Sequence, residues 1–302
     1  MKLRDTVLKA TEILKNNGVG TPGLDAEVLM EKILSKDRIF LILHPDYEVG
    51  EEESRLFFEA VGERAAGKPA AYIVGEKEFM GLPFYVSESV LIPRPDTEVV
   101  AEEAIRIIEV GGAFEHGVSG GESRKPEGAY GGVPKILDLC TGSGALAVSL
   151  AHYLKNAEVT ATDISVEALE VAEKNAERNG TTVRFLQGDL FEPVPEGETF
   201  DLIISNPPYI PSEEIEKLEK NVKDYEPRLA LDGGGSGLDF YRRIVPEAAD
   251  YLKPGGALVL EIGFDQAEDL HKLGEGTGVY EDFAVLQDLA GLDRVVTMKK
   301  KG

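Results

Sequence analysis

The tetrapeptide Asn206-Pro-Pro-Tyr209 is the segment of this 302-residue chain best suited to hold a polar group for reaction. It directly follows the apolar run Phe200 to Ser205, which predicts a buried central strand. Proline has no backbone N–H, so Pro207 and Pro208 expose carbonyl oxygens that no neighbouring amide of the motif can take. The Asn206 side chain offers a further acceptor. Together these acceptors can hold both hydrogens of an NH2 group.

An NH2 group held in this way is suited to receive a methyl group. An amide nitrogen is a poor nucleophile because its lone pair is delocalised, so acceptors that draw on its hydrogens and fix its orientation assist in-line transfer. This scheme requires no separate general base, and Tyr209 can stack on or wall off the planar substrate group. A Pro-rich turn alone would be commonplace, but its place at the end of a buried strand favours a functional interpretation.

A second segment, Asp138-Leu-Cys-Thr-Gly-Ser-Gly-Ala145, ends a predicted strand and leads into a helix from Leu146. Glycines at such a turn let a ligand approach the backbone. The next predicted strand, Val159 to Asp163, ends in a carboxylate 25 positions after Asp138, where it can hydrogen-bond two ribose hydroxyls. These two strand ends predict a nucleoside ligand.

The third strand ends at Gln187-Gly-Asp189-Leu-Phe191, which offers a carboxylate for an adenine amino group and an aromatic face for its ring. Acidic residues that end three successive strands suit a ligand without phosphates. NAD would favour a fuller Gly-x-Gly-x-x-Gly pattern, which the segment after Asp138 lacks. We therefore expect S-adenosylmethionine rather than NAD.

These segments need a scaffold, and the N-terminal part of the chain predicts a small helical bundle. Leu3, Val7, Ala10 and Leu14 recur at helix spacing. Two further apolar-periodic stretches run over residues 25–34 and from 56 to about 61. This bundle over residues 1–71 either recognises a partner or acts as a structural cap, and the sequence leaves both readings open.

From residue 72 to 91 the chain changes to short β-like segments broken by Gly81 and Pro83, which predict a hairpin linker. An amphipathic helix follows, with Thr97 or Asp96 as its expected cap. Residues 111–133 are Gly-rich and have few aliphatic side chains, so we expect a flexible surface insertion there.

After the insertion, β and α segments alternate, which predicts a mostly parallel sheet covered by helices on both faces. The expected strands lie near Ile136, Val159, Val183, Leu202 and Leu258. The last two apolar segments, 283–286 and 294–298, are expected to form a closing antiparallel hairpin.

Composition narrows the classes of partner. The formal charge of −23 argues against tight, nonspecific binding to a phosphate backbone, so no direct nucleic-acid partner is expected. One cysteine and four scattered histidines give no disulfide framework and no zinc-ligand spacing, so we expect no metal. No apolar run reaches the roughly 20 residues that cross a bilayer, and the first ten residues lack a signal-peptide pattern, so the expected compartment is the cytoplasm.

Over nearly its whole length the chain resembles the glutamine methyltransferases of peptide chain release factors, known as the HemK family. Besides Asn206 to Tyr209, the resemblance rests on four segments: Ile92-Pro-Arg-Pro-Asp-Thr-Glu98, Tyr225-Glu-Pro-Arg-Leu-Ala-Leu-Asp-Gly233, Gly237-Leu-Asp-Phe-Tyr241 and Leu252-Lys-Pro-Gly-Gly256. The family usually has a shorter connection where this chain has residues 111–133. The resemblance implies an α/β fold, with a Rossmann-like seven-stranded S-adenosylmethionine-dependent methyltransferase domain over residues 92–302.

In this family the substrate is the glutamine of a Gly-Gly-Gln loop on the release factor, and its methylation supports the ending of translation. The resemblance implies that the amide is held, and catalysis performed, by Asn206, Pro207, Pro208 and Tyr209. It implies cofactor contacts from Asp138, Cys140, Thr141, Gly142, Ser143, Gly144, Asp163, Ile164, Asp189, Leu190, Phe191 and Asn206. Arg94, Glu226 and Arg228 are further candidates for substrate binding, although Glu226 and Arg228 could equally form a structural ion pair.

Three alternatives stay open at this point. The Asn-Pro-Pro-Tyr tetrad is shared with methylases of adenine in DNA, so an exocyclic amine of a nucleic-acid base is the nearest rival substrate. A glutamine of a ribosomal protein is a closer variant. A nucleoside-binding protein without catalysis is a third, which the intact Asn206 to Tyr209 segment argues against. The simplest assembly that fits the release-factor hypothesis is a monomer.

Overall fold

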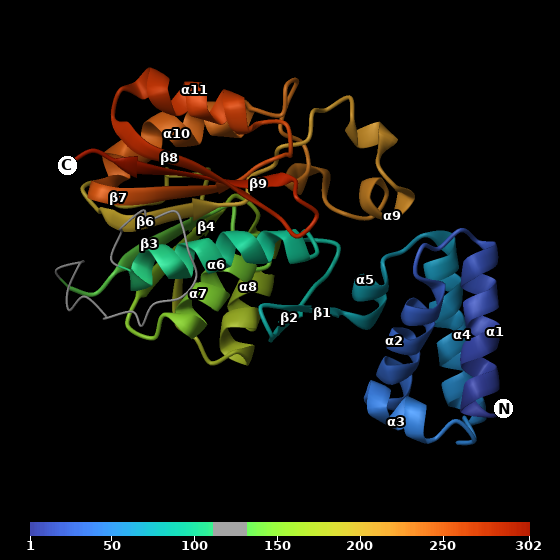
Figure 1. Ribbon diagram of the computed structural model, residues 1–302. Helices are drawn as coiled ribbons and strands as arrows, with labels where there is room; N and C mark the ends of the chain where they lie inside the picture. Colours follow the sequence, from blue (N-terminus) through green and yellow to red (C-terminus); the bar gives the residue numbers. More distant parts are fainter. Residues whose placement is uncertain (111–131) are drawn as a thin grey trace. The chain divides into compact units, whose positions relative to one another are not determined.

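The computed structural model describes residues 1–110 and 132–302, and these divide into two compact units (Figure 1). The first unit comprises residues 1–76, 86–88 and 218–226, and the second comprises residues 77–85, 89–217 and 227–302. The insertion predicted over residues 111–133 lies outside the described residues except for Gly132 and Val133. We describe each unit separately.

The first unit is helical, and its core is apolar. Leu3, Ala10 and Leu14 lie on one face of the first helix and are almost completely buried, because their spacing brings them to the same side at 3.6 residues per turn. Phe57 and Met30 fill the same core. The helices are α1 (Leu3–Asn16), α2 (Pro22–Leu34), α3 (Arg38–Leu43), α4 (Glu51–Ala66) and α5 (Ala70–Val74).

Helices α1, α2 and α4 occupy the three stretches that periodicity predicted. Helices α3 and α5 were not predicted, because elements of six and five residues are too short to show a period. The segment 218–226, with the short helix α9 (Lys220–Lys223), also belongs to this unit. It is attached by the Lys220 side chain, which donates to the carbonyl oxygen of Ala66 at 2.8 Å.

Within the described residues of the second unit, seven strands form a sheet of order β5-β4-β3-β6-β7-β9-β8. Strands β3 to β7 are parallel, and β9 runs antiparallel to both β7 and β8, so the predicted closing hairpin is confirmed. The strands are β3 (Lys135–Leu139), β4 (Glu158–Asp163), β5 (Val183–Gln187), β6 (Phe200–Ser205), β7 (Leu252–Glu261), β8 (Tyr280–Gln287) and β9 (Asp293–Lys300). This is the Rossmann-like arrangement that the sequence predicted.

Helices cover both faces of this sheet (Figure 1). Successive strand residues point to opposite faces, so Ile136 packs under the first group of helices and Leu137 under the second. The first group is α6 (Pro95–Glu109), α7 (Ala145–Tyr153) and α8 (Val166–Arg178). The second group is α10 (Asp239–Tyr251) and α11 (Ala267–Thr277), and two short 3-10 turns, Ile215–Lys217 and Arg228–Ala230, complete the helical segments.

A two-stranded hairpin, β1 (Glu76–Phe79) and β2 (Leu82–Tyr85), lies within the range predicted for a hairpin linker. Its two turn residues, Met80 and Gly81, both have positive φ, as a tight hairpin turn requires. The buried Asn175 of α8 bonds the backbone of Tyr85 in both directions, and its Nδ2 also donates to the carbonyl oxygen of Ser143 at 2.8 Å. One side chain therefore fixes both the hairpin and the turn after β3.

The strand order places a topological switch between β3 and β6, because the chain moves outward from β3 to β4 and β5 and then returns to β6. Ligands of open α/β sheets bind at the carboxyl ends of the strands beside such a switch. Cys140 follows β3 and Asn206 follows β6 at this position. No helix among the described residues is both long and apolar enough to cross a membrane.

Candidate active site

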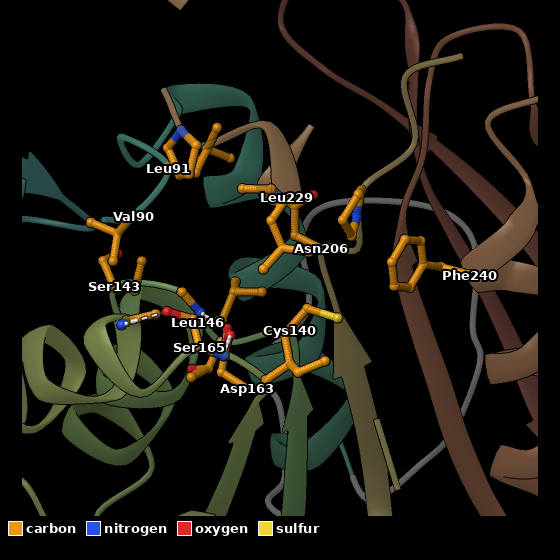
Figure 2. A pocket seen from close by; sticks show the side chains of 18 of the residues that line it. Val90, Leu91, Cys140, Ser143, Leu146, Asp163, Ser165, Asn206, Leu229 and Phe240 are labelled. Carbon is orange, nitrogen blue, oxygen red and sulfur yellow. Dashed lines mark hydrogen bonds between the residues drawn. The ribbon is translucent and has the colours of Figure 1, made fainter. Parts of the chain in front are cut away.

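A cavity of about 270 Å³ opens at the carboxyl ends of β3, β4, β5 and β6, entirely within the second unit (Figure 2). Its walls come from the segments after these strands, from residues 89–97 before and in α6, and from residues 227–230 and 240–243. In Figure 2, Val90 and Leu91 lie on one side and Phe240 on the other, with Cys140 and Asn206 between them. The cavity thus lies at the switch point.

The turn after β3 is held in shape by Asp138, whose side chain is completely buried. Its Oδ2 accepts hydrogen bonds from the Thr141 hydroxyl at 2.6 Å and from the Ala147 amide at 3.2 Å. Burial raises the pKa of the Asp138 carboxyl to about 7. Asp138 does not line the cavity but shapes the turn that does, and its predicted contact with the cofactor stays a prediction.

Gly144 allows this turn to pack against helix α8. Its φ is +79°, and a Cβ there would lie 3.0 Å from the Cβ of Ala172. Gly142 also has a positive φ, and its amide donates to Asp163 at 2.8 Å. The glycines therefore serve backbone shape and close packing, and the loop they form lines the cavity at Gly142.

Asp163 lies at the end of β4 and lines the cavity, as predicted. Its two carboxylate oxygens accept from the backbone amides of Gly142 and Ser165, at 2.8 and 2.9 Å. Burial raises the pKa of this carboxyl, and the two amide bonds oppose the rise. A carboxylate fixed in this way presents its remaining lone pairs to hydroxyl donors in the cavity.

The end of β5 differs in part from the prediction. Asp189 lines the cavity, but its Oδ2 accepts from Arg243 at 2.7 Å, so one oxygen is already paired with a cation. The Phe191 ring is fully buried and stacks on Tyr251, with ring centroids 4.7 Å apart. The ring therefore belongs to the hydrophobic core and does not line the cavity, and its contact with a ligand base stays a prediction.

Asn206 lines the cavity at the end of the wholly buried strand β6, as predicted. Its Nδ2 donates to the Thr97 hydroxyl oxygen at 3.3 Å, so the carbonyl oxygen of the same planar amide points away from Thr97. Pro208 also lines the cavity, whereas Pro207 and Tyr209 do not. The Tyr209 hydroxyl instead donates to the Glu261 carboxylate at 3.3 Å.

The backbone after this motif is fixed from behind by residues 231–237. The Ile210 amide donates to the carbonyl oxygen of Leu231, and the Gly233 amide donates to that of Ile210. A Cβ at Gly233 would lie 2.7 Å from the Cα of Tyr209, so only glycine permits this approach. Gln266 Nε2 donates to the carbonyl oxygen of Tyr209 at 3.0 Å. The glycines of the downstream segment thus support the tetrapeptide.

Thr97 does not cap helix α6, contrary to the prediction, and neither does Asp96. The helix begins at Pro95, and the residue before it, Arg94, makes no side-chain cap hydrogen bond. Thr97 lies inside the first turn with 5% of its surface exposed, and its hydroxyl is directed at the site instead. It therefore contributes to the site and not to the helix end.

Three further candidates have mixed outcomes. Arg94 lines the cavity. Arg228 is half exposed and pairs with Glu216 and Asp232 at 3.3 and 3.2 Å. Glu226 is buried and belongs to the first unit, and neither it nor Arg228 lines the cavity. Of the predicted site residues, those that line the cavity are Arg94, Cys140, Thr141, Gly142, Ser143, Asp163, Ile164, Asp189, Leu190, Asn206 and Pro208.

The sequence interpretation missed several residues of the site. Phe240, Leu229 and Leu146 supply apolar lining. Thr97 and the buried Glu261 stand behind the tetrapeptide. Phe240 and Thr97 both lie inside segments on which the family resemblance rests, so the resemblance could have pointed to them. Glu261 lies outside those segments, and no sequence signal pointed to it.

The lining fits a nucleoside-containing cofactor better than a phosphate-rich one. Most of the lining is apolar, and of its two cations, Arg94 and Arg243, the second is already paired with Asp189. Within the described residues, no cluster of three or more histidine, cysteine or acidic side chains could hold a metal ion.

Comparison with known proteins gives two family matches. Residues 5–75 match the family described as PrmC N-terminal domain, and residues 132–224 match the family described as Methyltransferase small domain. A release factor glutamine methyltransferase of Clostridium acetobutylicum is 40% identical over the full length of both chains. A protein with the same description from Geobacter sulfurreducens is 44% identical, over 94% of this chain and 91% of its own.

One of the similar solved structures supports the fold. The catalytic domain of hMettl16, solved with an RNA hairpin, has a TM-score of 0.53 at 15% identity, over 82% of this chain and 81% of its own. A release factor-specific protein-(glutamine-N5) methyltransferase from Alicyclobacillus acidocaldarius is 29% identical, covering 72% of this chain and all of its own, with a TM-score of 0.41. The family is established by the two sequence relatives, which align with this chain over 94% or more of its length.

The chain is an S-adenosylmethionine-dependent methyltransferase and belongs to the release factor glutamine methyltransferase family, as its sequence segments predicted.

Proposed function

We propose that this enzyme transfers a methyl group from S-adenosylmethionine to the side-chain amide nitrogen of the glutamine in the Gly-Gly-Gln motif of a peptide chain release factor. The observation that carries the proposal is the Asn206 amide at the cavity wall, with its Nδ2 bound to Thr97 and its oxygen directed away from Thr97. An oxygen in this position can accept a hydrogen from an NH2 group. The relatives described as release factor glutamine methyltransferases supply the substrate class.

On the cofactor side, Asp163 and the turn after β3 would hold the nucleoside. The Asp163 carboxylate is fixed by the Gly142 and Ser165 amides and can accept hydrogen bonds from the two ribose hydroxyls. Val90, Leu146 and Ile164 provide an apolar surface for the base. When bound, S-adenosylmethionine supplies an electrophilic methyl group.

On the substrate side, the chain's own residues would orient the amide. Asn206 accepts one amide hydrogen, and Pro207 and Pro208 have no N–H that could compete with the substrate for their neighbours' carbonyl oxygens. Fixing the nitrogen in this way lowers the entropic part of the barrier, because the lone pair is aimed before reaction. As the new N–C bond formed, the bond between the methyl group and the cofactor's sulfur would break with its electron pair staying on sulfur, and one N–H proton would pass by way of these acceptors to water.

The test is transfer of a tritiated methyl group from S-adenosylmethionine to three acceptors offered separately: a recombinant release factor, a ribosomal protein fraction and DNA or RNA. We expect label on the release factor alone. Label on ribosomal protein or nucleic acid, with none on the release factor, would show that the substrate assignment is wrong.

A matched pair of variants then ties the reaction to the site. Asn206→Ala removes the acceptor at the cavity wall, and we expect activity to fall about 100-fold or more, the loss typical of removing one oriented polar group. Asn179→Ala is the control, because Asn179 bonds the backbone of Pro83 and Asn175 away from the cavity. Equal activity in both variants would contradict the role of Asn206.

We further propose that the enzyme acts in the cytoplasm and modifies its release factor as a monomer. Sedimentation equilibrium of the purified chain tests the second point, and a dimer mass would contradict it.

A further inference from the structure

Glu261 is a buried acid that the proposed chemistry leaves without a role. It ends β7 beside the tetrapeptide, and only 1% of its surface is exposed. An ionised carboxyl in such a place is costly unless several groups satisfy it. The Tyr209 hydroxyl donates to its Oε1 at 3.3 Å, and its Oε2 has no hydrogen-bond partner among the described residues. Because its burial is energetically costly, we infer that Glu261 has a function in the site.

The neighbours of Glu261 connect it to the cavity wall. The Thr97 hydroxyl interacts with the Glu261 carboxyl, and Thr97 in turn accepts from the Nδ2 of Asn206 at 3.3 Å. The Tyr241 hydroxyl donates to the backbone oxygen of Glu261 at 2.7 Å and fixes the end of the strand. One carboxyl therefore reaches both the first and the last residue of the tetrapeptide, through Thr97 and directly through Tyr209.

The available protons determine which group donates and which accepts in the contacts between Glu261, Thr97 and Asn206. A threonine hydroxyl has one proton to donate, and an ionised carboxylate can only accept. When Glu261 is ionised, the Thr97 proton is drawn toward it, and the Thr97 oxygen can then only accept from Asn206. Asn206 must turn its NH2 group to Thr97 and its carbonyl oxygen toward the substrate position. A neutral residue 261 removes this constraint, because Thr97 could then donate to the Asn206 oxygen.

We propose that Glu261 is a positioning residue for methyl transfer: through Thr97 it orients the Asn206 amide so that oxygen, and not nitrogen, faces the substrate amide, and through Tyr209 it holds the last residue of the tetrapeptide. This role rests on the proposed function of the site. The contacts at 3.3 Å are long for hydrogen bonds, as catalytic contacts commonly are before substrate binds.

The charges around Glu261 come from three elements. Arg294 of β9 stabilises the ionised form, Asp96 of α6 opposes it, and Tyr209 and Thr97 supply hydrogen bonds that favour it. Arg294 is itself shared with Asp288 and Asp96, at 3.0 and 3.7 Å. Burial outweighs these partners and raises the pKa of the Glu261 carboxyl to about 7. The orienting form thus becomes populated as the pH rises through neutrality.

The first experiment compares Glu261→Gln with the wild-type enzyme on a recombinant release factor. We expect kcat to fall about 10- to 100-fold, since misaligned reacting groups commonly cost this much, while the affinity for S-adenosylhomocysteine stays unchanged. Wild-type kcat/KM should rise with a midpoint near pH 7, and the variant should show no such step. Glu103→Gln is the matched control, because Glu103 is also buried but pairs with Arg106 of the same helix and does not line the cavity.

A second pair of variants tests the link at Thr97. Thr97→Ser keeps the hydroxyl and should retain most activity, whereas Thr97→Val keeps the shape and should lose as much as Glu261→Gln. Full activity in Thr97→Val, or the same pH step in Glu261→Gln as in the wild type, would overturn the proposal.

A third readout needs no methyl transfer. In asparagine-labelled protein, the ¹⁵N–¹H signals of the Asn206 side chain, assigned by their loss in Asn206→Ala, should shift with a midpoint near pH 7 and become insensitive to pH in Glu261→Gln. Chemical shifts of the Asn206 side chain that change neither with pH nor in Glu261→Gln would overturn the positioning role. If the wild-type enzyme methylated no release factor, this measurement would still decide the orientation, so failure of the two proposals can be told apart.

Discussion

Gly233→Ala perturbs the support behind the tetrapeptide at a residue that does not itself line the cavity. The new Cβ would lie 2.7 Å from the Cα of Tyr209 and 2.8 Å from the carbonyl oxygen of Pro208, both backbone atoms that cannot rotate away. Ordinary contact begins at 3.4 Å, so the backbone of residues 208–209 must move by about 0.7 Å. Overpacking of this kind costs about 1–3 kcal/mol of stability.

The same movement should reach the chemistry. A displacement of about 1 Å in a reacting group can lower a rate about 100-fold, so we expect kcat for release factor methylation to fall about tenfold or more. Thermal unfolding should begin earlier, by about 2–4 °C for each kcal/mol lost. Binding of S-adenosylhomocysteine, measured by calorimetry, should change little, because the turn after β3 and Asp163 are not involved.

Gly235→Ala is the control, since a Cβ at this position of the same segment meets nothing within 4 Å and its φ is not positive. We expect it to keep wild-type stability and rate. If Gly233→Ala behaved like Gly235→Ala in both assays, the close approach of this segment to Tyr209 would not support the site, and the reasoning would be refuted.

Two further predictions concern the cofactor side. Asp163→Ala should weaken S-adenosylhomocysteine binding about 10-fold or more, because hydrogen bonds to an ionised group contribute about 1.5–3 kcal/mol each; unchanged affinity by calorimetry would show that the cofactor does not use this carboxylate. Asp138 has a pKa raised to about 7 by burial, so between about pH 4 and 7 the folded chain keeps a proton that the unfolded chain has already released. This group therefore destabilises the fold as the pH rises through that window, and Asp138→Asn should gain stability relative to the wild type as the pH rises from about 4 to 7; a difference in melting temperature that stays constant with pH would contradict this.

The parts of the site that the sequence predicted are local in the chain. Asn206 follows an apolar run, and Asp163 ends an alternating one, so the pattern of a buried strand with a polar end located both. The parallel sheet then followed, because strands that alternate with helices have few other ways to pack. The closing antiparallel hairpin was predictable from a different signal, two apolar segments separated by Gly291.

The parts that the sequence did not predict depend on contacts between distant residues. Thr97 and Asn206 are 109 positions apart, and Tyr209 and Glu261 are 52 apart, so no spacing rule connects them. Threonine is also a common residue type at helix N-caps, so the sequence suggested the wrong role for Thr97. The burial of Phe191 was also not predicted, because an aromatic residue after a strand can turn either to a ligand or to the core, and here the ring stacks on Tyr251.

The central claim is that the site methylates the side-chain nitrogen of a glutamine. Tandem mass spectrometry of a release factor treated with this enzyme and S-adenosylmethionine tests it most directly, with Asn206→Ala as control. We predict a single added methyl group on the glutamine of the Gly-Gly-Gln loop, absent in the control. A methyl group on another residue, or on that glutamine in equal amount with Asn206→Ala, would contradict the account.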